Sequence, residues 1–383
     1  LFWKAIFKIT NSSEMITFGQ SGITISGDAG LLRDIFDNQS NSFSNQSVTN
    51  LSVMDSDGFT TDSFTRGNGG VVIYINPSHP SASDSYSLAQ AQNMSTPLKS
   101  LSAATEKTKS GSYNNTGTTF KIQQGTTQNV DDYGNDGVYI YTSGYSLSSP
   151  IIIESYWDST PGAGGTQGVR PIINANGYGT CVKITGNWSN NHSNIVLRGL
   201  KLVSQPDGGH PFANQSPGNN IILDDCELVS GGNVLELQAY MKDVTINRCI
   251  IVDGWGVGGH IQGIYAAGMD NLLIFQTIVE NCGRRGLTGL YGDIYSHNCY
   301  IQTGMGPATF DECILSRGGA TGIQLRSGGV ITNCLFSKNG LDAFVSMNGG
   351  RIGNCYVEKT TDIPLEDGIS IERRGYGLYP TGS

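Results

Sequence analysis

The chain has 383 residues, 14% of them charged, and a formal net charge of −9 at pH 7. This acidic balance argues against the phosphate backbone of a nucleic acid as a partner. No run of 18 apolar residues occurs, so we expect no membrane span. The composition is rich in Ser, Thr, Asn and Gly and poor in Lys and Arg, which favours an extracellular, secreted or virion-associated protein. The length allows one large domain with an appendage.

Residues 1–69 are predicted to form an N-terminal adaptor or linker region. Residues 16–19 and 23–26 alternate in hydrophobicity and are separated by a Gly, which indicates two short strands. Residues 37–52 are rich in Asn, Ser and Gln, which is typical of a loop. Because the chain begins at Leu1 and not at Met, we expect that an upstream segment is missing or was removed.

Residues 70–180 are predicted to form the entrance to the main domain. Thr96 is a good N-cap and Pro97 suits the first helical position, so a short helix is expected over 96–107. Such a helix would cover the open end of a stack of strands, which otherwise exposes unpaired edges. Strands are expected at 71–75, 119–122, 138–141, 150–153 and 170–173.

One phrase then recurs between residues 194 and 357. It consists of an apolar residue, two mostly polar residues, a Cys or a substitute, any residue, and an apolar residue. The Cys position falls at Leu200, Cys226, Cys249, Thr277, Cys299, Cys313, Cys334 and Cys355. The spacing averages about 22 residues, and a period in this range marks a solenoid.

The repeats alternate with period 2 and contain no stretch of helical periodicity, so each is expected to be a coil of short strands. We therefore predict an all-β fold, a single-stranded right-handed parallel β-helix over 70–375 followed by a tail over 376–383. The Cys column is expected to be buried, and disulfides between coils are possible but would strain a regular ladder. The Asn at 298, 333 and 354, just before the Cys, suits left-handed backbone at a corner.

This architecture resembles the pectate-lyase-like superfamily, and its N-terminal coils resemble bacterial and phage β-helix proteins, including tailspikes. The segments 297–302, 306–307 and 322–329 also resemble bacterial right-handed β-helix proteins. The resemblance implies a ligand groove along one face of stacked strands, which suits an extended polymer. The Asp-Asp, His-Gly and Arg-x-Lys motifs of polygalacturonases and the Arg-x-Pro-x-x-Arg motif of pectate lyase are not assembled here.

Strand alternation predicts which side chains line such a groove. The candidate substrate-binding residues are Glu236, Tyr265, Tyr291, Asp293, Gln302, Gln324 and Phe344. Their aromatic rings could stack on sugars. The alternative is an ordinary sheet surface with scattered exposed residues.

The step of 14 residues from Cys299 to Cys313 is too short for three strands and predicts a notch. In this register His297 and Asp311 are neighbours, so the carboxylate could orient the imidazole. His297 or Tyr300 could then transfer a proton in uronide β-elimination, with Arg326 neutralising the substrate carboxylate. The alternative is that His297 only holds a corner and that Arg326 makes an ordinary ion pair.

Hydrolysis would instead need two facing carboxylates. Asp224 with Asp225, or Asp293 with Asp311, could supply them. No CxxC or CxxH pair predicts zinc, and no cofactor is expected. Calcium is possible but is not indicated by any acidic cluster.

A column of apolar residues is also predicted to point outward just after the Cys position. It comprises Ile250, Ile278, Tyr300, Ile314, Leu335 and Tyr356. Such a stripe needs a cover, which could be loops or the other subunits of a homotrimer.

Two functions remain open. One is a carbohydrate-active protein that binds and could cleave a polysaccharide. The other is a non-catalytic structural or receptor-binding component of a phage tail, virion or surface fibre.

Overall fold

The computed structural model forms two compact units, Leu1–Ser56 with Thr60–Ser63, and Asp57–Phe59 with Phe64–Ser383. The residues that it describes are 15–19, 22–26, 47–48, 70–109, 117–130, 137–175, 179–184, 192–205, 207–238, 240–285, 292, 295–302, 304–346, 350–357, 363–364, 371–372 and 378–381.

The small unit contains a three-stranded antiparallel sheet. Its strands are β1 (Met15–Gly19), β2 (Gly22–Ser26) and β3 (Ser47–Val48), in the order β1-β2-β3. The two strands expected at 16–19 and 23–26 are therefore confirmed, and they pair with each other. Most of the loop expected over 37–52 lies outside the described residues.

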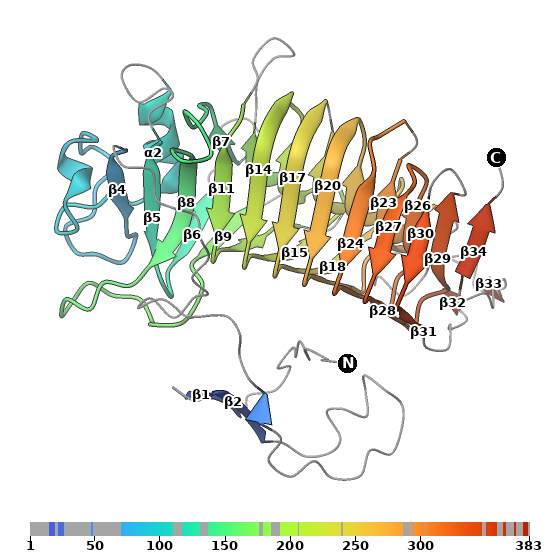
Figure 1. The fold of residues 1–383 in the computed structure, drawn as a ribbon. Helices are drawn as coiled ribbons and strands as arrows, with labels where there is room; N and C mark the ends of the chain where they lie inside the picture. The colour runs from blue at the N-terminus through green and yellow to red at the C-terminus, as the bar shows by residue number, and fades with distance from the viewer. Residues whose placement is uncertain are drawn as a thin grey trace. The chain divides into compact units, whose positions relative to one another are not determined.

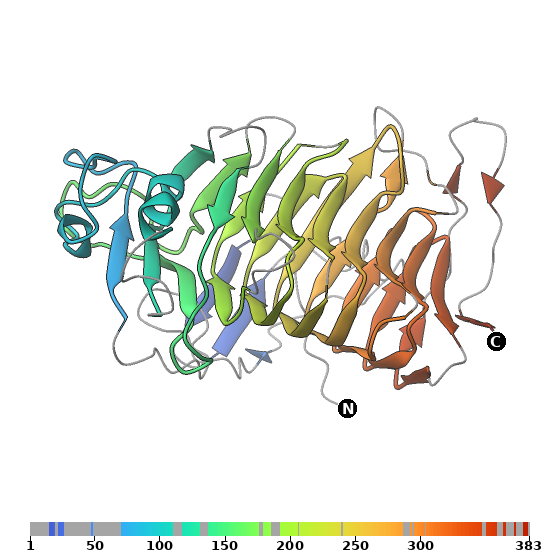
Figure 2. The same ribbon diagram turned by 90° about the horizontal axis from the view of Figure 1, so that it is seen from above.

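The large unit consists of three parallel sheets that the chain visits in turn (Figure 1, Figure 2). The first sheet contains β4 (Val72–Ile75), β5 (Thr119–Gln123), β8 (Ile151–Tyr156), β11 (Ile195–Arg198), β14 (Gly218–Asp224), β17 (Met241–Asn247), β20 (Met269–Phe275), β24 (Ala308–Asp311), β27 (Gly329–Thr332) and β30 (Arg351–Gly353). The second sheet contains β6 (Thr127–Val130), β9 (Ile172–Ala175), β12 (Lys201–Val203), β15 (Glu227–Gly231), β18 (Ile250–Gly256), β21 (Ile278–Glu280), β25 (Ile314–Ser316), β28 (Leu335–Ser337) and β31 (Tyr356–Val357). The third sheet contains β7 (Val138–Ile140), β10 (Thr180–Ile184), β13 (His210–Asn214), β16 (Asn233–Leu237), β19 (Gln262–Ala266), β23 (His297–Ile301), β26 (Thr321–Leu325), β29 (Leu341–Ser346) and β34 (Leu378–Thr381).

The stacking of like residues forms the core of this unit. Leu223 pairs with Ile246, and Ile246 with Ile274, so inward side chains of successive coils lie directly on one another. All three sheets contribute to one continuous apolar core that runs from Ile73 to Val345. Each coil buries its apolar face only against its neighbours, as a solenoid requires. The predicted right-handed parallel β-helix is confirmed.

A short helix closes the N-terminal end of the core. Helix α2 (Leu101–Thr108) follows the 3-10 turn η1 (Gln90–Gln92), and Leu101 and Ala104 are fully buried in the core. The capping helix is confirmed, but it begins later than predicted. Its N-cap is Ser100, whose side chain accepts a hydrogen bond from the Ala103 amide at 3.1 Å. Figure 1 shows α2 beside β5.

A column of small hydrogen-bonding residues lies where each coil turns from the first sheet to the second. The thiols of Cys226, Cys249 and Cys313 donate to the carbonyl two residues earlier, and Thr277 donates in the same way at 2.9 Å. A small side chain with a hydrogen-bond donor therefore suits this position, because it can donate to the last backbone carbonyl of the preceding strand. All eight Cys are free, and seven of them are buried.

The residue before this column has left-handed backbone in every coil from Asp225 onward. The φ values lie between 48° and 53° at Asp225, Arg248, Gln276, Glu312, Asn333 and Asn354. The predicted corner geometry is therefore confirmed at Asn333 and Asn354. It is wrong at Asn298, which lies within β23, where its side chain accepts a hydrogen bond from the Cys282 amide.

Cys299 does not belong to the column either. It lies in β23 of the third sheet, between Ile264 and Ile323. The coil that leaves Thr277 returns at Cys313, which is 36 residues later. The predicted short coil and its notch are therefore wrong. The error arises because every strand of a solenoid needs inward residues at alternate positions, so the phrase around Cys299 resembles those of another sheet.

The third sheet continues close to the end of the chain. Strand β34 (Leu378–Thr381) pairs in parallel with β29, so part of the expected tail extends this sheet. The strands β32 (Ile363–Pro364) and β33 (Ile371–Glu372) form a small antiparallel pair between β31 and β34.

Candidate functional site

The outward side of the third sheet brings together most of the predicted substrate-binding residues. Strand pairing places Glu236 beside Tyr265, Tyr265 beside Tyr300, Tyr300 beside Gln324, and Gln324 beside Phe344. These residues form one column along the solenoid, which we call the outer column. Tyr300, predicted from a different register, belongs to it as well.

Two tyrosine rings with nearly parallel planes lie together in the middle of the outer column, and we call this pair the platform. The rings of Tyr265 and Tyr300 stack with their centroids 5.8 Å apart and their planes within 7°. Tyr265 donates from its hydroxyl to Gln302 Oε1 at 2.9 Å. Burial, with smaller contributions from Tyr300 and Glu236, raises the pKa of Tyr265, so its hydroxyl keeps its proton at neutral pH.

Arg326 completes this platform. Its Nη1 donates to the Tyr300 hydroxyl at 2.8 Å, and the side chain is exposed. No carboxylate among the described residues lies within ion-pair distance of this guanidinium. The alternative pairing with Asp293 cannot be described, because Asp293 and Tyr291 lie outside the described residues. Phe344 is placed by its backbone only.

His297 lies beneath the platform. It is only 1% exposed, its Nδ1 lies 2.7 Å from Thr321 Oγ1, and its ring stacks on Tyr300 with a centroid distance of 5.6 Å. The imidazole is thus placed to fix the Tyr300 ring, and its burial leaves it no surface for direct contact with a bound sugar.

Asp311 is not part of this group. It ends β24 in the first sheet, beside Phe275 and Thr332, whereas His297 pairs with Gln262 in the third sheet. Its Oδ1 accepts hydrogen bonds from Thr332 Oγ1 at 3.0 Å and Asn333 Nδ2 at 2.8 Å. The predicted His297–Asp311 contact is therefore wrong, for the same reason as the short coil.

Glu236 is a saturated carboxylate. It is 4% exposed, and its Oε1 accepts from Gln215 at 3.1 Å and Gln238 at 2.7 Å. Its Oε2 accepts from Asn233 at 3.3 Å and lies 3.0 Å from His210 Nε2. Three amide donors and the His210 imidazole thus surround the two oxygens, so each carboxylate oxygen already has partners within the protein. Glu236 therefore orients its neighbours and has no free oxygen for a ligand.

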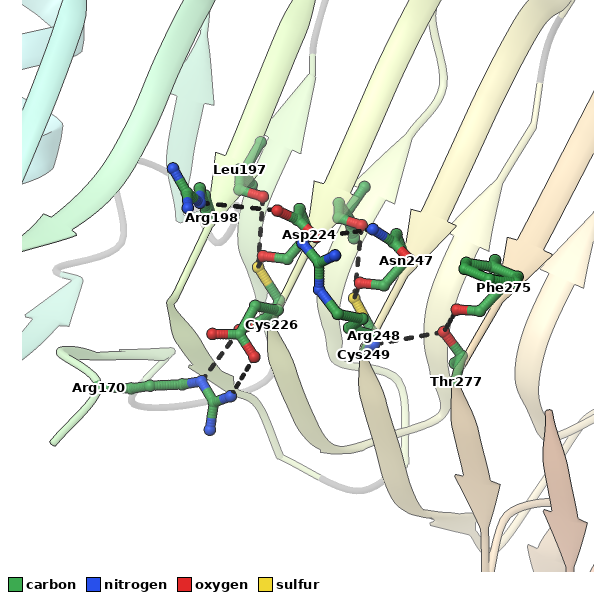
Figure 3. A network of polar contacts seen from close by, with 12 residues as sticks. Arg170, Leu197, Arg198, Asp224, Cys226, Asn247, Arg248, Cys249, Phe275 and Thr277 are labelled. Atoms are coloured by element: carbon green, nitrogen blue, oxygen red, sulfur yellow. Dashed lines mark hydrogen bonds and ion pairs between the residues drawn. The ribbon is translucent and has the colours of Figure 1, made fainter. Parts of the chain in front are cut away.

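The carboxylates of Asp224 and Asp225 both bind arginines of the scaffold, and Figure 3 shows Asp224 between Arg198 and Arg248. Asp224 is fully buried and contacts Asn247 and Arg248, with Arg198 Nε at 3.6 Å. Asp225 pairs with Arg170 at 2.7 Å, and burial raises the pKa of its carboxyl against the opposing effect of Arg170.

No group of three or more His, Cys, Asp or Glu is close enough to hold a metal ion in the described part of the chain. Among the same residues, no helix is long and apolar enough to cross a membrane.

The predicted apolar stripe is present on the second sheet, and its member Ile278 is itself buried, with 4% of its surface exposed. Ile250, Ile278, Ile314, Leu335 and Tyr356 pair in succession along the outer side of β18, β21, β25, β28 and β31. Tyr300 is not a member, because β23 belongs to the third sheet. It belongs instead to the outer column, between Tyr265 and Gln324.

Comparison with known proteins finds a distant similarity to solved structures. No family model matches the chain, and no curated protein is similar to it. The crystal structure of the native GH136 lacto-N-biosidase from Eubacterium ramulus is similar at 12% identity with a TM-score of 0.40, covering 81% of this chain and 59% of that chain. Its selenomethionine derivative is similar at 14% identity with a TM-score of 0.27, covering 72% and 43%. The chain thus spans less than two thirds of that enzyme, and likeness at this level carries no conclusion about activity.

Sequence reasoning missed several residues of this face. Tyr139 and Lys183 precede Ala213 and Glu236 in the outer column. Gln215 comes directly after Asn214, and Gln238 comes directly after Leu237, which pairs with Asn214. Gln302 and Arg326 have the same place in later coils, directly after the paired residues Ile301 and Leu325. The alternation of side chains in β10 and β13 indicates which of their residues point outward. Aligning these residues with those of β19 requires knowing that the three strands belong to one sheet.

Proposed function

We propose that the outer side of the third sheet binds an extended acidic polysaccharide. The stacked pair Tyr265 and Tyr300 with Arg326 at its edge carries this proposal. Flat aromatic faces suit the apolar faces of sugar rings, because they bury area at little conformational cost. The column continues from coil to coil, so a linear polymer can follow it with successive residues on successive strands, about 4.8 Å apart.

The charge at the platform favours an acidic sugar over a neutral one. Arg326 is exposed and has no carboxylate partner among the described residues. A planar guanidinium binds a carboxylate or a sulfate through two parallel hydrogen bonds. Glu236, the acidic residue among the described side chains of this column, is already matched by His210 and three amides.

If the protein cleaves its ligand, the arrangement suits β-elimination better than hydrolysis. Elimination needs a group that neutralises the uronate and a group that moves a proton, and Arg326 and Tyr300 lie in contact. His297 holds the Tyr300 ring from below and acts as a positioning residue. Hydrolysis needs two free carboxylates facing each other, and Glu236 is saturated.

The test is a panel of acidic and neutral polysaccharides, including polygalacturonate, alginate and a neutral β-glucan. Binding is measured by affinity electrophoresis, and cleavage by reducing ends and by the ultraviolet absorbance of unsaturated products. Arg326→Ala is expected to weaken binding of acidic polymers. Tyr300→Phe is expected to retain binding, because the stacked ring remains, and to lose cleavage.

Tyr356→Phe is the matched control, since it removes the same hydroxyl from the outer side of the second sheet. Binding that is unchanged in both Arg326→Ala and a Tyr300→Ala variant would contradict the proposal. Binding without any new end groups or unsaturated product would support a non-catalytic binding protein.

A second function has an observation of its own. The stripe of Ile250, Ile278, Ile314 and Leu335 runs through four successive coils of the second sheet. Such a stripe favours a subunit interface, as in a secreted or virion-borne fibre in which the solenoid is a rigid rod. This function and polysaccharide binding use different sheets, so one protein can have both.

A further inference from the structure

The two tyrosines of the platform each make a diagonal hydrogen bond to a side chain of the next coil. Tyr265 donates from its hydroxyl to Gln302 Oε1 at 2.9 Å, and Arg326 Nη1 donates to the Tyr300 hydroxyl at 2.8 Å. The register explains this repetition, because Tyr300 follows Tyr265 and Gln324 follows Tyr300 in the outer column. Gln302 and Arg326 therefore occupy equivalent places, two residues beyond the outer column in successive coils.

The first of these bonds determines which end of the Gln302 amide is left for a ligand. Burial raises the pKa of Tyr265, so its hydroxyl keeps its proton and remains the donor. The amide oxygen of Gln302 is the group held by Tyr265, which leaves the two N–H groups of Nε2. Nε2 has no hydrogen-bond partner in the described part of the chain and is open to solvent. Ala267 takes the equivalent place one coil earlier, so no long side chain of that coil covers the amide there.

The second bond has the opposite direction. Because Tyr300 accepts from Arg326, the proton of its own hydroxyl remains available to a ligand. The exposed Arg326 guanidinium uses one of its five N–H groups in this contact. Tyr300, Gln302 and Arg326 thus all retain unused hydrogen-bond donors, and we call these three residues the donor cluster.

The spacing within the donor cluster suits one anionic group. The Tyr265 and Tyr300 rings are nearly parallel with centroids 5.8 Å apart, and each holds one of the two donor side chains. Neighbouring parallel strands lie about 4.8 Å apart, so the Gln302 amide and the Arg326 guanidinium are separated by about one coil. A carboxylate or a sulfate accepts hydrogen bonds of about 2.8 Å on each oxygen, so one such group can bridge both side chains.

We propose that Tyr300, Gln302 and Arg326 together bind one oxyanion substituent, a carboxylate or a sulfate ester, on a single sugar of the polymer. This inference rests on the proposed function. It adds Gln302 as a residue that determines specificity and Tyr265 as the residue that positions the Gln302 amide. An oxyanion has lone pairs for all three donors and forms charge-assisted bonds with them, whereas a neutral sugar hydroxyl has fewer and weaker acceptor positions.

The experiment is isothermal titration with three oligomers of similar length: an oligogalacturonate, a neutral β-glucan, and the same β-glucan carrying sulfate esters. Gln302→Ala is expected to weaken binding of an anionic oligomer about tenfold, because a hydrogen bond to a charged group is lost. Gln302→Glu is expected to weaken it further, since a second negative charge repels the oxyanion. Affinity for the neutral β-glucan is expected to stay the same. The anionic oligomer that loses affinity identifies the bound group as a carboxylate or as a sulfate.

Tyr265→Phe tests the positioning role, since this variant keeps the stacked ring and loses only the hydroxyl that holds the amide. We expect it to weaken binding of the same oligomer about as much as Gln302→Ala does. The double variant is expected to lose no more than either single variant, because both changes remove the same contact. Gln167→Ala is the matched control, as Gln167 is exposed and lies outside the strands of the third sheet.

The donor cluster is refuted if Gln302→Ala binds both anionic oligomers as tightly as the wild type, or if it loses equally on all three oligomers. Losses in Tyr265→Phe and Gln302→Ala that multiply in the double variant would overturn the positioning role of Tyr265. The proposed function then still stands, provided that Arg326→Ala weakens binding of an anionic oligomer. Wild-type protein that binds neither anionic oligomer would overturn both.

Discussion

Asp224 and Asp311 occupy the same column of the first sheet and differ in burial, which makes them a matched pair for a stability test. Asp224 is fully buried, whereas Asp311 is partly exposed. Pairing runs from Asp224 through Asn247 and Phe275 to Asp311. The same substitution at both positions therefore compares a buried carboxylate that faces two arginines with a partly exposed carboxylate that faces neutral donors.

We expect Asp224→Ala to lower the free energy of unfolding by about 3 kcal/mol. Removing one partner of a buried ion pair costs about 3–5 kcal/mol, because the remaining charge stays uncompensated. The lower end applies, since the side chains of Arg198 and Arg248 remain 13% and 17% exposed and can turn toward water. Asp311→Ala is expected to cost about 1 kcal/mol, because its two donors can bond to water instead.

The assay is urea unfolding followed by far-ultraviolet circular dichroism, with melting temperatures as a second measure. A loss of about 3 kcal/mol corresponds to a fall of about 4 °C in the melting temperature of a unit of this size, because the unfolding entropy is about 2.1 cal/mol/K per residue. Equal losses in the two variants, or a loss below about 1 kcal/mol in Asp224→Ala, would refute this account of the charged column. Polysaccharide binding is expected to be unchanged in Asp311→Ala, since Asp311 lies outside the third sheet.

Three other predictions follow from the described contacts. Arg326→Lys is expected to weaken binding of an acidic polysaccharide about tenfold by isothermal titration, because an ammonium cannot form the two parallel hydrogen bonds that a guanidinium makes with a carboxylate. Equal affinities of the variant and the wild type would argue against a site specific for a guanidinium. Burial raises the pKa of Cys181 and of Cys282 to about 12, so the folded state keeps both protons after the unfolded chain loses them. The free energy of unfolding should therefore fall as the pH rises from about 8.5 to about 12, and it should fall less in a Cys181→Ala, Cys282→Ala double variant. Urea unfolding midpoints measured across this pH range test the prediction. The same dependence of the midpoint on pH in both proteins would contradict it. Light scattering is expected to show three chains of 40.8 kDa for the wild type and one for Leu335→Glu, whereas a monomeric wild type would remove the predicted trimer.

The alternation of side chains was sufficient to predict several features from sequence. Inward residues at every second position determine that the chain forms stacked strands, and they also determine which residues point outward. Glu236, Tyr265 and Gln324 were placed correctly on the outer side of their strands for this reason. The recurring Cys was informative because a compact donor is needed at each corner, as the shared hydrogen bond of Cys249 and Thr277 shows.

The assignment of each strand to one of three sheets was decided only by the tertiary structure. A short alternating phrase looks the same in every sheet, because each sheet imposes the same inward periodicity. Cys299 was therefore placed one sheet away from its true neighbours, and His297 was paired with Asp311 instead of lying against Tyr300. A coil of 14 residues cannot hold three strands, and this conflict was the one sequence signal of the error.

The candidate site itself is a product of that assignment. Tyr300 and Arg326 are 26 residues apart in sequence, and their contact exists because β23 and β26 pair in register. The same holds for Tyr139 and Tyr265, which no local pattern connects. Sequence determined the periodicity and the outward faces, because these depend on single strands. Pairing between strands determined which outward residues share a surface. This pairing depends on the length of the chain segment that connects successive strands of one sheet, and that length varies from coil to coil.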